Sequence, residues 1–294
     1  MMGALRILRR VIGMNQEIVI RLGYPAASKL LVIHADDFGM CNSVNLAIVE
    51  LLDEERVTSA SVMVPCPGFN DAAKYISSHR TADIGVHLTI TSEWAPLRWH
   101  PVSGNAVKEG FTTPAGSFWT TVKDVMLYSR GRVLNELTAQ VETAIRCGIK
   151  PTHLDTHMFA LLRTPRLFRD YLATGERFDL PCLVPPLPSI QTVPFRHFVP
   201  DSLLQATTDV APDQWKDYYL TLLQSIPAGI TVLLTHPGYD DDELRAITKG
   251  SSGWDARWRQ RDFDVLRSPE FRSAILKNGV QLISWREIRS ALTC

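Results

Sequence analysis

The sequence lacks an excess of charge of either sign, because 31 lysine and arginine residues balance 31 aspartate and glutamate residues. This balance argues against a general attraction to nucleic acid or to an anionic membrane, so we expect neither as a partner. No apolar run approaches the ~20 residues of a membrane-spanning helix. Near the N-terminus the longest uncharged run, residues 11–16, is shorter than a signal-peptide core of about 7–15 residues. We therefore expect a cytoplasmic protein.

Paired cysteines are also lacking. The five cysteines are odd in number, lie far apart and include no C-x-x-C pair. This usage is typical of a reducing compartment and argues against a thiolate metal site. The chain has 294 residues, of which 45% are hydrophobic, so it can bury a large core without disulfide support.

What the sequence does contain is an alternation of apolar runs and amphipathic segments. Runs with the β-branched character of strands occupy residues 29–35, 57–64, 83–91, 151–159 and 229–235. The segments between them carry helix signals, namely a cap at Asn42 or Ser43, a cap at Asn70 or Asp71, and a closing Gly148. Further helices are expected over 214–223 and in a final segment that ends near Leu292.

Repeated strand–helix units bury a parallel sheet with helices outside it, either as a closed barrel or as an open doubly wound sheet. The chain length favours the barrel, which typically takes about 250 residues. The predicted fold class is α/β: a single-domain (β/α) barrel, TIM-like but distorted, with parallel strands and outer helices. Residues 1–28 are expected to form an N-terminal extension or helix, and residues 29–294 the barrel. The first dozen residues would be a frayed amphipathic helix or the product of an upstream start.

Histidine and aspartate gather where these strands are predicted to end, which is the edge that holds the active site of a parallel barrel. The residues are His34, Asp36, Asp37, His87, His153, Asp155, His157 and His236. The ordinary role of the Asp36-Asp37 pair would be a turn or a helix cap, but Asn42 and Ser43 already offer caps. If both carboxylates line a pocket, one can bind a cation while the other serves as a base.

The segment His153-Leu154-Asp155-Thr156-His157 carries the strongest single signal. In an extended chain its two histidines and Asp155 share a face, and burying them together is costly unless a cation or hydrogen bonds satisfy them. His87 and His236 could each be a hydrogen-bonded structural histidine instead. Two imidazoles with one carboxylate are nevertheless a common ligand set for a divalent metal, which polarises a carbonyl or activates water.

Four motifs in this order resemble the YdjC-like, or ChbG-type, carbohydrate deacetylases. They are HADDFG at 34–39, GVHLT at 85–89, PTHLDTHM at 151–158 and THPGY at 235–239. They span most of the chain, and VQLISWREI near its end fits the last strand and helix of the family.

The resemblance implies a barrel related to polysaccharide deacetylases and a divalent metal, magnesium or zinc, held by Asp37, His87 and His157. It implies that Asp36 is the general base that activates water and that His236 protonates the departing amine. His153 and Asp155 would orient the ligands or touch the substrate. The base and ligand roles within Asp36-Asp37 could be exchanged.

The chain departs from the family directly after His157. Many members continue with further histidines, whereas residues 158–162 here are Met-Phe-Ala-Leu-Leu, so the resemblance does not extend to chitooligosaccharide specificity. A tryptophan-rich insertion could supply stacking platforms for a sugar ring or could pack the interior. Its tryptophans are Trp94, Trp99 and Trp119.

The function predicted from these observations is hydrolysis of the acetamide of an N-acetylated sugar or oligosaccharide by a metal-dependent carbohydrate deacetylase. The expected partner is a small N-acetylated carbohydrate, and a homodimer is left open. One alternative is a non-haem iron oxygenase that uses His153-x-Asp155 and His236, which the strand–helix alternation opposes. The other is a non-catalytic sugar-binding barrel, which the retention of Asp36 beside a complete ligand set opposes.

Overall fold

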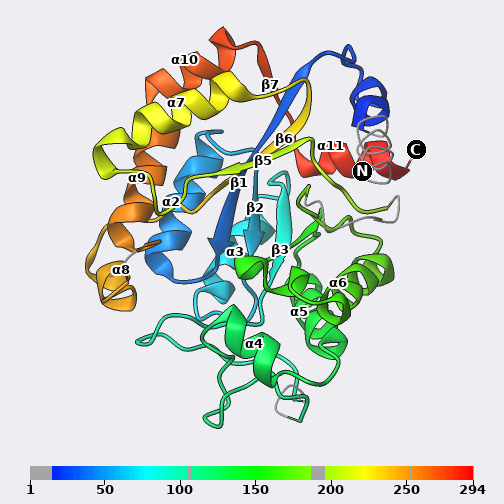
Figure 1. Cartoon of the computed structure of the whole chain (residues 1–294), viewed down its shortest axis with the longest axis vertical. Helices are drawn as coiled ribbons and strands as arrows, with labels where there is room; N and C mark the ends of the chain where they lie inside the picture. The colour runs from blue at the N-terminus through cyan, green and yellow to red at the C-terminus, as the bar shows by residue number, and fades with distance from the viewer. Residues whose placement is uncertain (1–14, 105–107, 187–195, 252, 294) are drawn as a thin grey trace.

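The computed structural model describes residues 15–104, 108–186, 196–251 and 253–293. Its centre is a curled parallel sheet with strand order β4-β3-β2-β1-β6-β5, and β7 pairs with β1 (Figure 1). The strands are β1 (Lys29–Phe38), β2 (Ser59–Val62), β3 (Ile84–Leu88), β4 (Leu154–Thr156), β5 (Ser202–Gln205), β6 (Gly229–Thr235) and β7 (Val280–Leu282).

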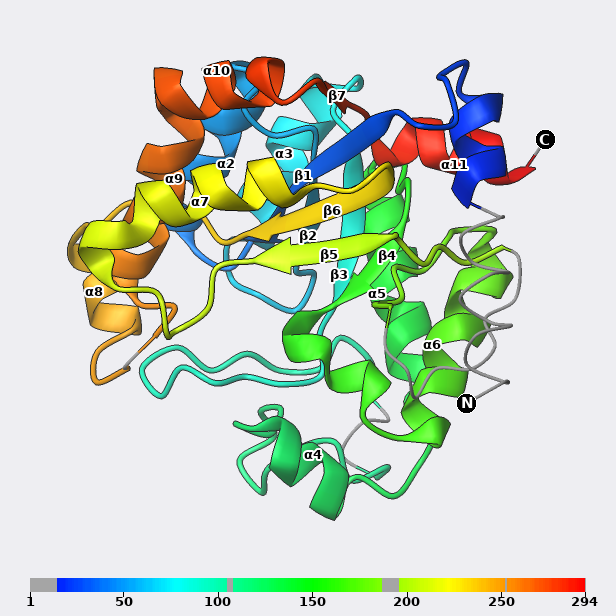
Figure 2. The same ribbon diagram turned by 45° about the horizontal axis from the view of Figure 1, so that its top comes forward.

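Helices cover the outside of this sheet (Figure 2). They are α2 (Asn42–Asp53), α3 (Phe69–Ser78), α4 (Val122–Tyr128), α5 (Leu134–Arg146), α6 (Pro165–Phe178), α7 (Trp215–Ser225), α8 (Asp242–Ile247), α9 (Ala256–Arg267), α10 (Pro269–Lys277) and α11 (Trp285–Thr293), with short 3₁₀ helices η1 (His157–Leu162) and η2 (Pro212–Gln214). Among the described residues, none of the helices is long and apolar enough to cross a membrane.

The predicted α/β barrel is confirmed, and so is its distortion. Strand β1 runs through the middle of the sheet and is buried from Leu30 to Phe38, as expected for a strand covered on both faces. The sheet does not close by pairing of β4 with β5, which lie at opposite ends of the strand order in the described part of the chain. Isolated bridges from Leu154 to Cys182 and from Leu183 to Phe198 continue the curl beyond β4.

The end of β1 differs from the prediction in a way that shapes the site. The strand runs past residue 35 to Phe38, and its register against β2 shifts between Ala35 and Phe38. Asp37 has a φ of 69°, in the left-handed region that costs roughly 1–2 kcal/mol for a residue with a side chain. Adjacent residues of a regular strand point to opposite faces, whereas this irregularity lets Asp36 and Asp37 line the same cavity.

Two of the predicted helix caps are wrong, and the third is confirmed. Helix α2 begins at Asn42 itself, so neither Asn42 nor Ser43 is its cap. A residue of α8 accepts a hydrogen bond from its first turn instead, because Ser43 N–H donates to Glu243 Oε2 at 2.6 Å. Helix α3 follows Gly68, so Asn70 and Asp71 lie inside its first turn. Gly148 does follow α5 with a φ of 85°, the left-handed conformation of a residue that closes a helix.

In the described part of the predicted N-terminal extension, residues 15–21 form a helix, which lies beside α11 (Figures 1 and 2), and turns follow over residues 22–28. Its residues Ile18 and Val19 are buried in one cluster with Trp285 and Ile288. Asn15 Nδ2 donates to the carbonyl oxygen of Val199 at 2.9 Å. The predictions for the first dozen residues fall outside the described residues, and the domain division after residue 28 stays a prediction.

Buried His197 is expected to make the stability of the fold depend on pH. Burial lowers the pKa of His197 to about 4, and its Nδ1 accepts a hydrogen bond from Cys182 N–H at 3.3 Å. An unfolded histidine titrates near 6.5, so between about pH 6.5 and 4 the unfolded chain binds more protons than the folded one. Stability is therefore expected to fall as pH decreases through this window.

Between pH 7 and pH 4, we expect the free energy of unfolding of His197→Gln to fall by about 2–3 kcal/mol less than that of the wild type. Urea unfolding at pH 7, 5.5 and 4 measures it, with the exposed His100→Gln as the matched control. Equal pH dependence in wild type and His197→Gln would contradict the assignment.

Candidate metal centre and catalytic pocket

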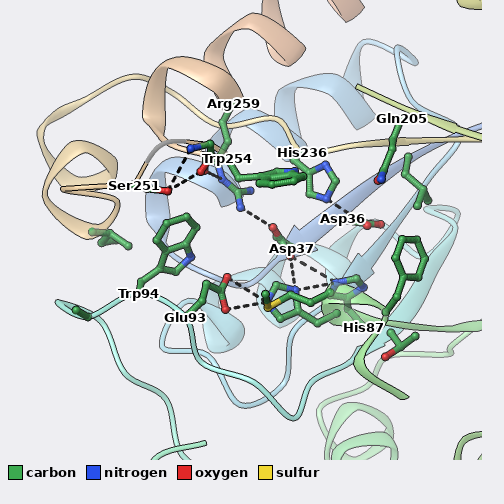
Figure 3. Close-up of a pocket in the computed structure, with 18 of the residues that line it drawn as sticks. Asp36, Asp37, His87, Glu93, Trp94, Gln205, His236, Ser251, Trp254 and Arg259 are labelled. Atoms are coloured by element: carbon green, nitrogen blue, oxygen red, sulfur yellow. Dashed lines mark hydrogen bonds and ion pairs between the residues drawn. The ribbon is translucent and has the colours of Figure 1, made fainter. Parts of the chain in front are cut away.

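The carboxyl ends of the strands open into a cavity of about 640 Å³ (Figure 3). Asp36 and Asp37 reach it from β1, His87 from β3, His157 from the start of η1, and His236 from the residue after β6. The cavity thus gathers five of the predicted site residues, which come from four separate strands or strand ends.

Three of these residues converge on one point. Asp37 Oδ1 lies 3.5 Å from His87 Nε2 and 3.2 Å from His157 Nδ1, and the two ring nitrogens lie 3.2 Å apart. Ligand atoms that share one tetrahedral ion at about 2.0–2.2 Å lie roughly 3.3–3.6 Å apart. Asp37 Oδ1 is buried and accepts no hydrogen bond from the described residues. Donor types, spacing and the unpartnered oxygen fit a divalent metal.

The electrostatics of this triad also favour a cation. Burial alone would lower the pKa of His157, but Glu93 and Asp37 raise it to about 10. Burial alone would raise the pKa of Asp37, but Arg259 and His157 hold it well below its usual range. Glu93 and Asp37 therefore favour the protonated, positively charged form of His157. A divalent ion bound at this point would replace the proton as the source of positive charge.

Asp155 fixes the orientation of His87. Its Oδ1 accepts from His87 Nδ1 at 2.9 Å, and its Oδ2 accepts from His34 Nε2 at 2.9 Å and from Ser61 Oγ at 2.8 Å. Burial alone would raise the pKa of Asp155, but the two histidines hold it well below its usual range. A carboxylate on Nδ1 leaves Nε2 of His87 for a metal, as the prediction of an orienting residue requires.

His153 does not line the cavity and does not belong to the group of Asp37, His87 and His157. Strand β4 ends at Thr156, and the two residues that follow His157, Met158 and Phe159, have φ values of 53° and 51°, so the chain turns sharply after His157. His153 stacks on Trp285 with ring centroids 4.4 Å apart. The polar residues of the HLDTH segment therefore divide between two groups: His157 joins Asp37 and His87, His153 joins His34, and Asp155 contacts a histidine of each.

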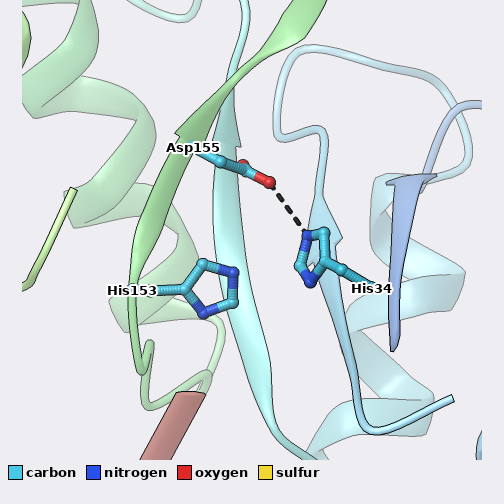
Figure 4. A group of neighbouring side chains, drawn as sticks. All are labelled: His34, His153 and Asp155. Atoms are coloured by element: carbon cyan, nitrogen blue, oxygen red, sulfur yellow. Dashed lines mark hydrogen bonds and ion pairs between the residues drawn. The ribbon is translucent and has the colours of Figure 1, made fainter. Parts of the chain in front are cut away.

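His34, His153 and Asp155 form a second buried group (Figure 4). Its donor types would also suit a metal, but His34 Nε2 and Asp155 Oδ2 bond each other directly. The His153 ring occupies the space beside Gly85, where a Cβ atom would collide with the ring at Nε2. We therefore interpret this group as a hydrogen-bonded support, and it explains the glycine of the GVHLT motif.

Asp36 and His236 face each other beside the triad. Asp36 Oδ2 lies 3.6 Å from His236 Nε2, and Asp36 Oδ1 lies 3.2 Å from His34 Nε2. Burial alone would lower the pKa of His34, but Asp155 and Asp36 raise it to about 10, so His34 places a positive charge beside both carboxylates. Burial lowers the pKa of His236, whose backbone N–H donates to Asp262 Oδ2 at 2.8 Å.

Sequence reasoning missed three buried or half-buried charged residues. Arg259 Nη2 donates to Asp37 Oδ2 at 2.7 Å, and its Nε donates to the carbonyl oxygen of Trp254 at 3.0 Å. Glu93 accepts from His157, and Asp262 holds the backbone of His236. Only Glu93 had a usable signal, as an acidic residue shortly after the third predicted strand; Arg259 is one of several arginines in α9 and nothing in the sequence distinguishes it.

The tryptophans of the insertion have different surroundings: one lines the cavity and the other two pack against the protein. Trp94 lines the cavity, as does Trp254, which was not predicted. Trp99 is fully buried and donates through Nε1 to the carbonyl oxygen of Thr91. Trp119 donates to the carbonyl oxygen of Gly110 at 2.8 Å and packs on α4 through Tyr128. Stacking on a sugar thus stays open for Trp94 alone among the three predicted platforms.

A family model described as YdjC-like protein matches residues 30–277. The chain belongs to the YdjC-like protein family. The resemblance of the four motifs is thereby confirmed, and the matched range contains every residue of the cavity described above. It also contains α9, which supplies Arg259.

The chain is similar to two curated carbohydrate deacetylases over nearly its whole length. It is 29% identical over 288 residues to the one from Thermus thermophilus, covering 94% of this chain and 99% of the relative. It is 31% identical over 263 residues to the one from Geobacillus stearothermophilus, covering 87% and 96%. A crystal structure from Enterococcus faecalis V583, provisionally described as a cellobiose-phosphate cleavage protein, shares the fold with a TM-score of 0.68, 23% identity and coverage of 89% and 99%.

Arg259 is expected to stabilise the metal-free protein strongly. In Arg259→Met the carboxylate of Asp37 stays buried without its cation, which typically costs about 3–5 kcal/mol. Added zinc is expected to reduce this loss, because a divalent ion would neutralise the same carboxylate. Urea unfolding with and without zinc measures both effects. The control is Arg177→Met, which breaks an exposed ion pair with Glu142 and should change stability little. If Arg259→Met lost the same stability with and without zinc, the result would count against the metal site.

Proposed function

We propose that the chain is a metal-dependent carbohydrate deacetylase that hydrolyses the acetamide of an N-acetylated sugar or oligosaccharide. The observation that carries the proposal is one cavity in which Asp37, His87 and His157 converge beside a separate carboxylate, Asp36, and imidazole, His236. The family and the names of its curated relatives support the substrate class. A cytoplasmic location and a homodimer stay predictions.

Asp37, His87 and His157 would hold the metal. Two imidazole ligands favour zinc over magnesium, which prefers oxygen donors. When bound, a divalent ion polarises the carbonyl of the acetyl group and makes water more acidic. Arg259 and Asp155 keep the carboxylate and the imidazole of His87 aimed at the ion.

Asp36 and His236 would move the protons. Asp36 takes a proton as water adds to the acetyl carbon. Its carboxylate lies beside Asp37, His87 and His157 but is not one of these three ligands, so it stays free to act as a base. When the C–N bond breaks, the leaving nitrogen takes a proton from His236. Asp36 Oδ2 lies 3.6 Å from His236 Nε2, so base and acid are neighbours, and the proton that Asp36 takes from water balances the one that His236 gives to the amine. The products are acetate and a free amine.

The structure does not favour an iron oxygenase. His153 does not line the cavity that holds His236, and Asp155 is engaged by His87, His34 and Ser61. The sheet is parallel throughout its described strand pairs.

Acetate release tests the proposal. Purified protein loaded with zinc or magnesium is incubated with N-acetylated mono- and oligosaccharides, and acetate and free amine are both quantified. We expect both products in equal amounts from at least one substrate. Protein that binds metal and releases acetate from none of them would refute the proposed activity and would leave the non-catalytic sugar-binding barrel.

A further inference from the structure

We propose that Glu93 is a positioning residue that fixes His157 as a metal ligand, so that each histidine of the triad is backed by its own carboxylate. This inference rests on the proposed metal centre but not on the deacetylase reaction.

The contact between Glu93 and His157 uses both carboxylate oxygens. Oε1 and Oε2 lie 3.1 and 3.0 Å from His157 Nε2, while Nδ1 on the other side of the ring faces Asp37 Oδ1 and His87 Nε2. A proton held on Nε2 by Glu93 leaves the lone pair of Nδ1 for a metal. The carboxylate thus selects both the tautomer and the ring orientation.

Glu93 completes a pattern that Asp155 begins. His87 presents Nε2 to the triad and Nδ1 to Asp155, whereas His157 presents Nδ1 to the triad and Nε2 to Glu93. Asp155 divides its oxygens among three donors. The hydrogen bonds of Glu93 within the described residues all go to His157. Its negative charge therefore acts on this one ring, which raises the basicity of the ligand nitrogen.

The segment that carries Glu93 is anchored through Ser92, the residue before it. Ser92 N–H donates to the carbonyl oxygen of Trp119 at 2.8 Å, and Ser92 Oγ accepts from Trp99 N–H at 3.0 Å. The Trp99 ring lies edge-on to His157, with centroids 6.3 Å apart. The carboxylate is therefore held in place before a metal arrives, and its side chain is only 17% exposed. Preorganised partners of this kind are the ones that change metal affinity when removed.

Zinc affinity tests the inference without any sugar present. Zinc is titrated into metal-free wild type, Glu93→Ala, Glu93→Gln and the control Glu142→Gln, in competition with a chromophoric chelator; Glu142 is exposed on α5. We expect Glu93→Ala to bind zinc about 10–100-fold more weakly than wild type. Glu93→Gln should lose less, because its amide oxygen still accepts from Nε2, and the control should match wild type.

A spectroscopic measurement separates orientation from folding. In ¹⁵N-histidine NMR of the zinc-loaded wild type, we expect one ring with a protonated Nε2 and a ligated Nδ1, and we expect this signal to shift or vanish in Glu93→Gln. The glutamine variant keeps the size of the side chain, so it carries the test if Glu93→Ala does not fold.

Zinc affinities of the Glu93 variants within twofold of wild type, with an unchanged histidine spectrum, would overturn the inference. Weak or absent zinc binding by the wild type would overturn it together with the metal centre. Zinc binding that depends on Glu93, in a protein that releases no acetate, would support the inference while refuting the proposed reaction.

Discussion

Replacing His87 by alanine is expected to abolish the binding of a divalent metal and to reduce acetate release by about 10³-fold or more. The change removes one of three converging donor atoms, and the two that remain, on Asp37 and His157, leave too few ligands for a stable site. The metal is worth several kcal/mol in the transition state, and each 1.36 kcal/mol is a factor of ten in rate.

Two measurements check this result. Metal content after dialysis against zinc is determined by mass spectrometry, and zinc affinity is determined by calorimetry. The exposed His100→Ala is the control and should bind zinc as wild type does. Full zinc occupancy in His87→Ala would contradict the triad and would point to the alternative set of His153, Asp155 and His236.

The alternation of strands and helices was predictable because each apolar run is buried on both faces. Strands β1 and β6 carry such runs, and they pair over the full length from Lys29–Gly229 to Ala35–Thr235. Curvature was not predictable to the same degree. The gap between β4 and β5 depends on the short strands and isolated bridges around Leu154 and Cys182, and short strands have weak periodicity.

The residues that converge in the cavity were predictable because they follow strands. The parallel topology brings the carboxyl ends of the strands together, so His87, His157 and His236 meet although they are distant in sequence. The direction in which each side chain points was less predictable. The register shift after Ala35 turns both Asp36 and Asp37 into the cavity, and the HLDTH segment divides between two groups, with His157 beside Asp37 and His87 and with His153 beside His34.

The residues that support the ligands were mostly beyond sequence reasoning. Arg259 bonds Asp37 across 222 positions in the sequence, and Glu93 bonds His157 across 64. Such pairs are created by tertiary packing, and the local sequence around each partner has no special pattern. Asp155 was the exception, because it lies two positions from His157 on a strand whose polar residues already required an explanation.

The second large effect is expected from Asp36→Asn, which should keep metal affinity near the wild-type value while acetate release falls by about 10²–10⁴-fold. An amide has nearly the same shape as the carboxylate but cannot accept the proton of the attacking water. The metal stays bound, because Asp36 Oδ2 faces His236 and Oδ1 faces His34. Initial rates at saturating zinc and zinc titrations on the same preparations measure the two quantities.

Asp37→Asn is the matched comparison, because the two aspartates are adjacent in the chain and line the same cavity. It replaces a buried carboxylate that Arg259 and His157 both contact, so it should weaken zinc binding as well as activity. Asp71→Asn, at an exposed ion pair with Lys74, controls for the loss of one charge. The opposite pattern, with zinc lost in Asp36→Asn and kept in Asp37→Asn, would exchange the two roles. Because the left-handed conformation of Asp37 turns its Oδ1 toward both ring nitrogens, the geometry favours Asp37 as the ligand and leaves Asp36 as the base.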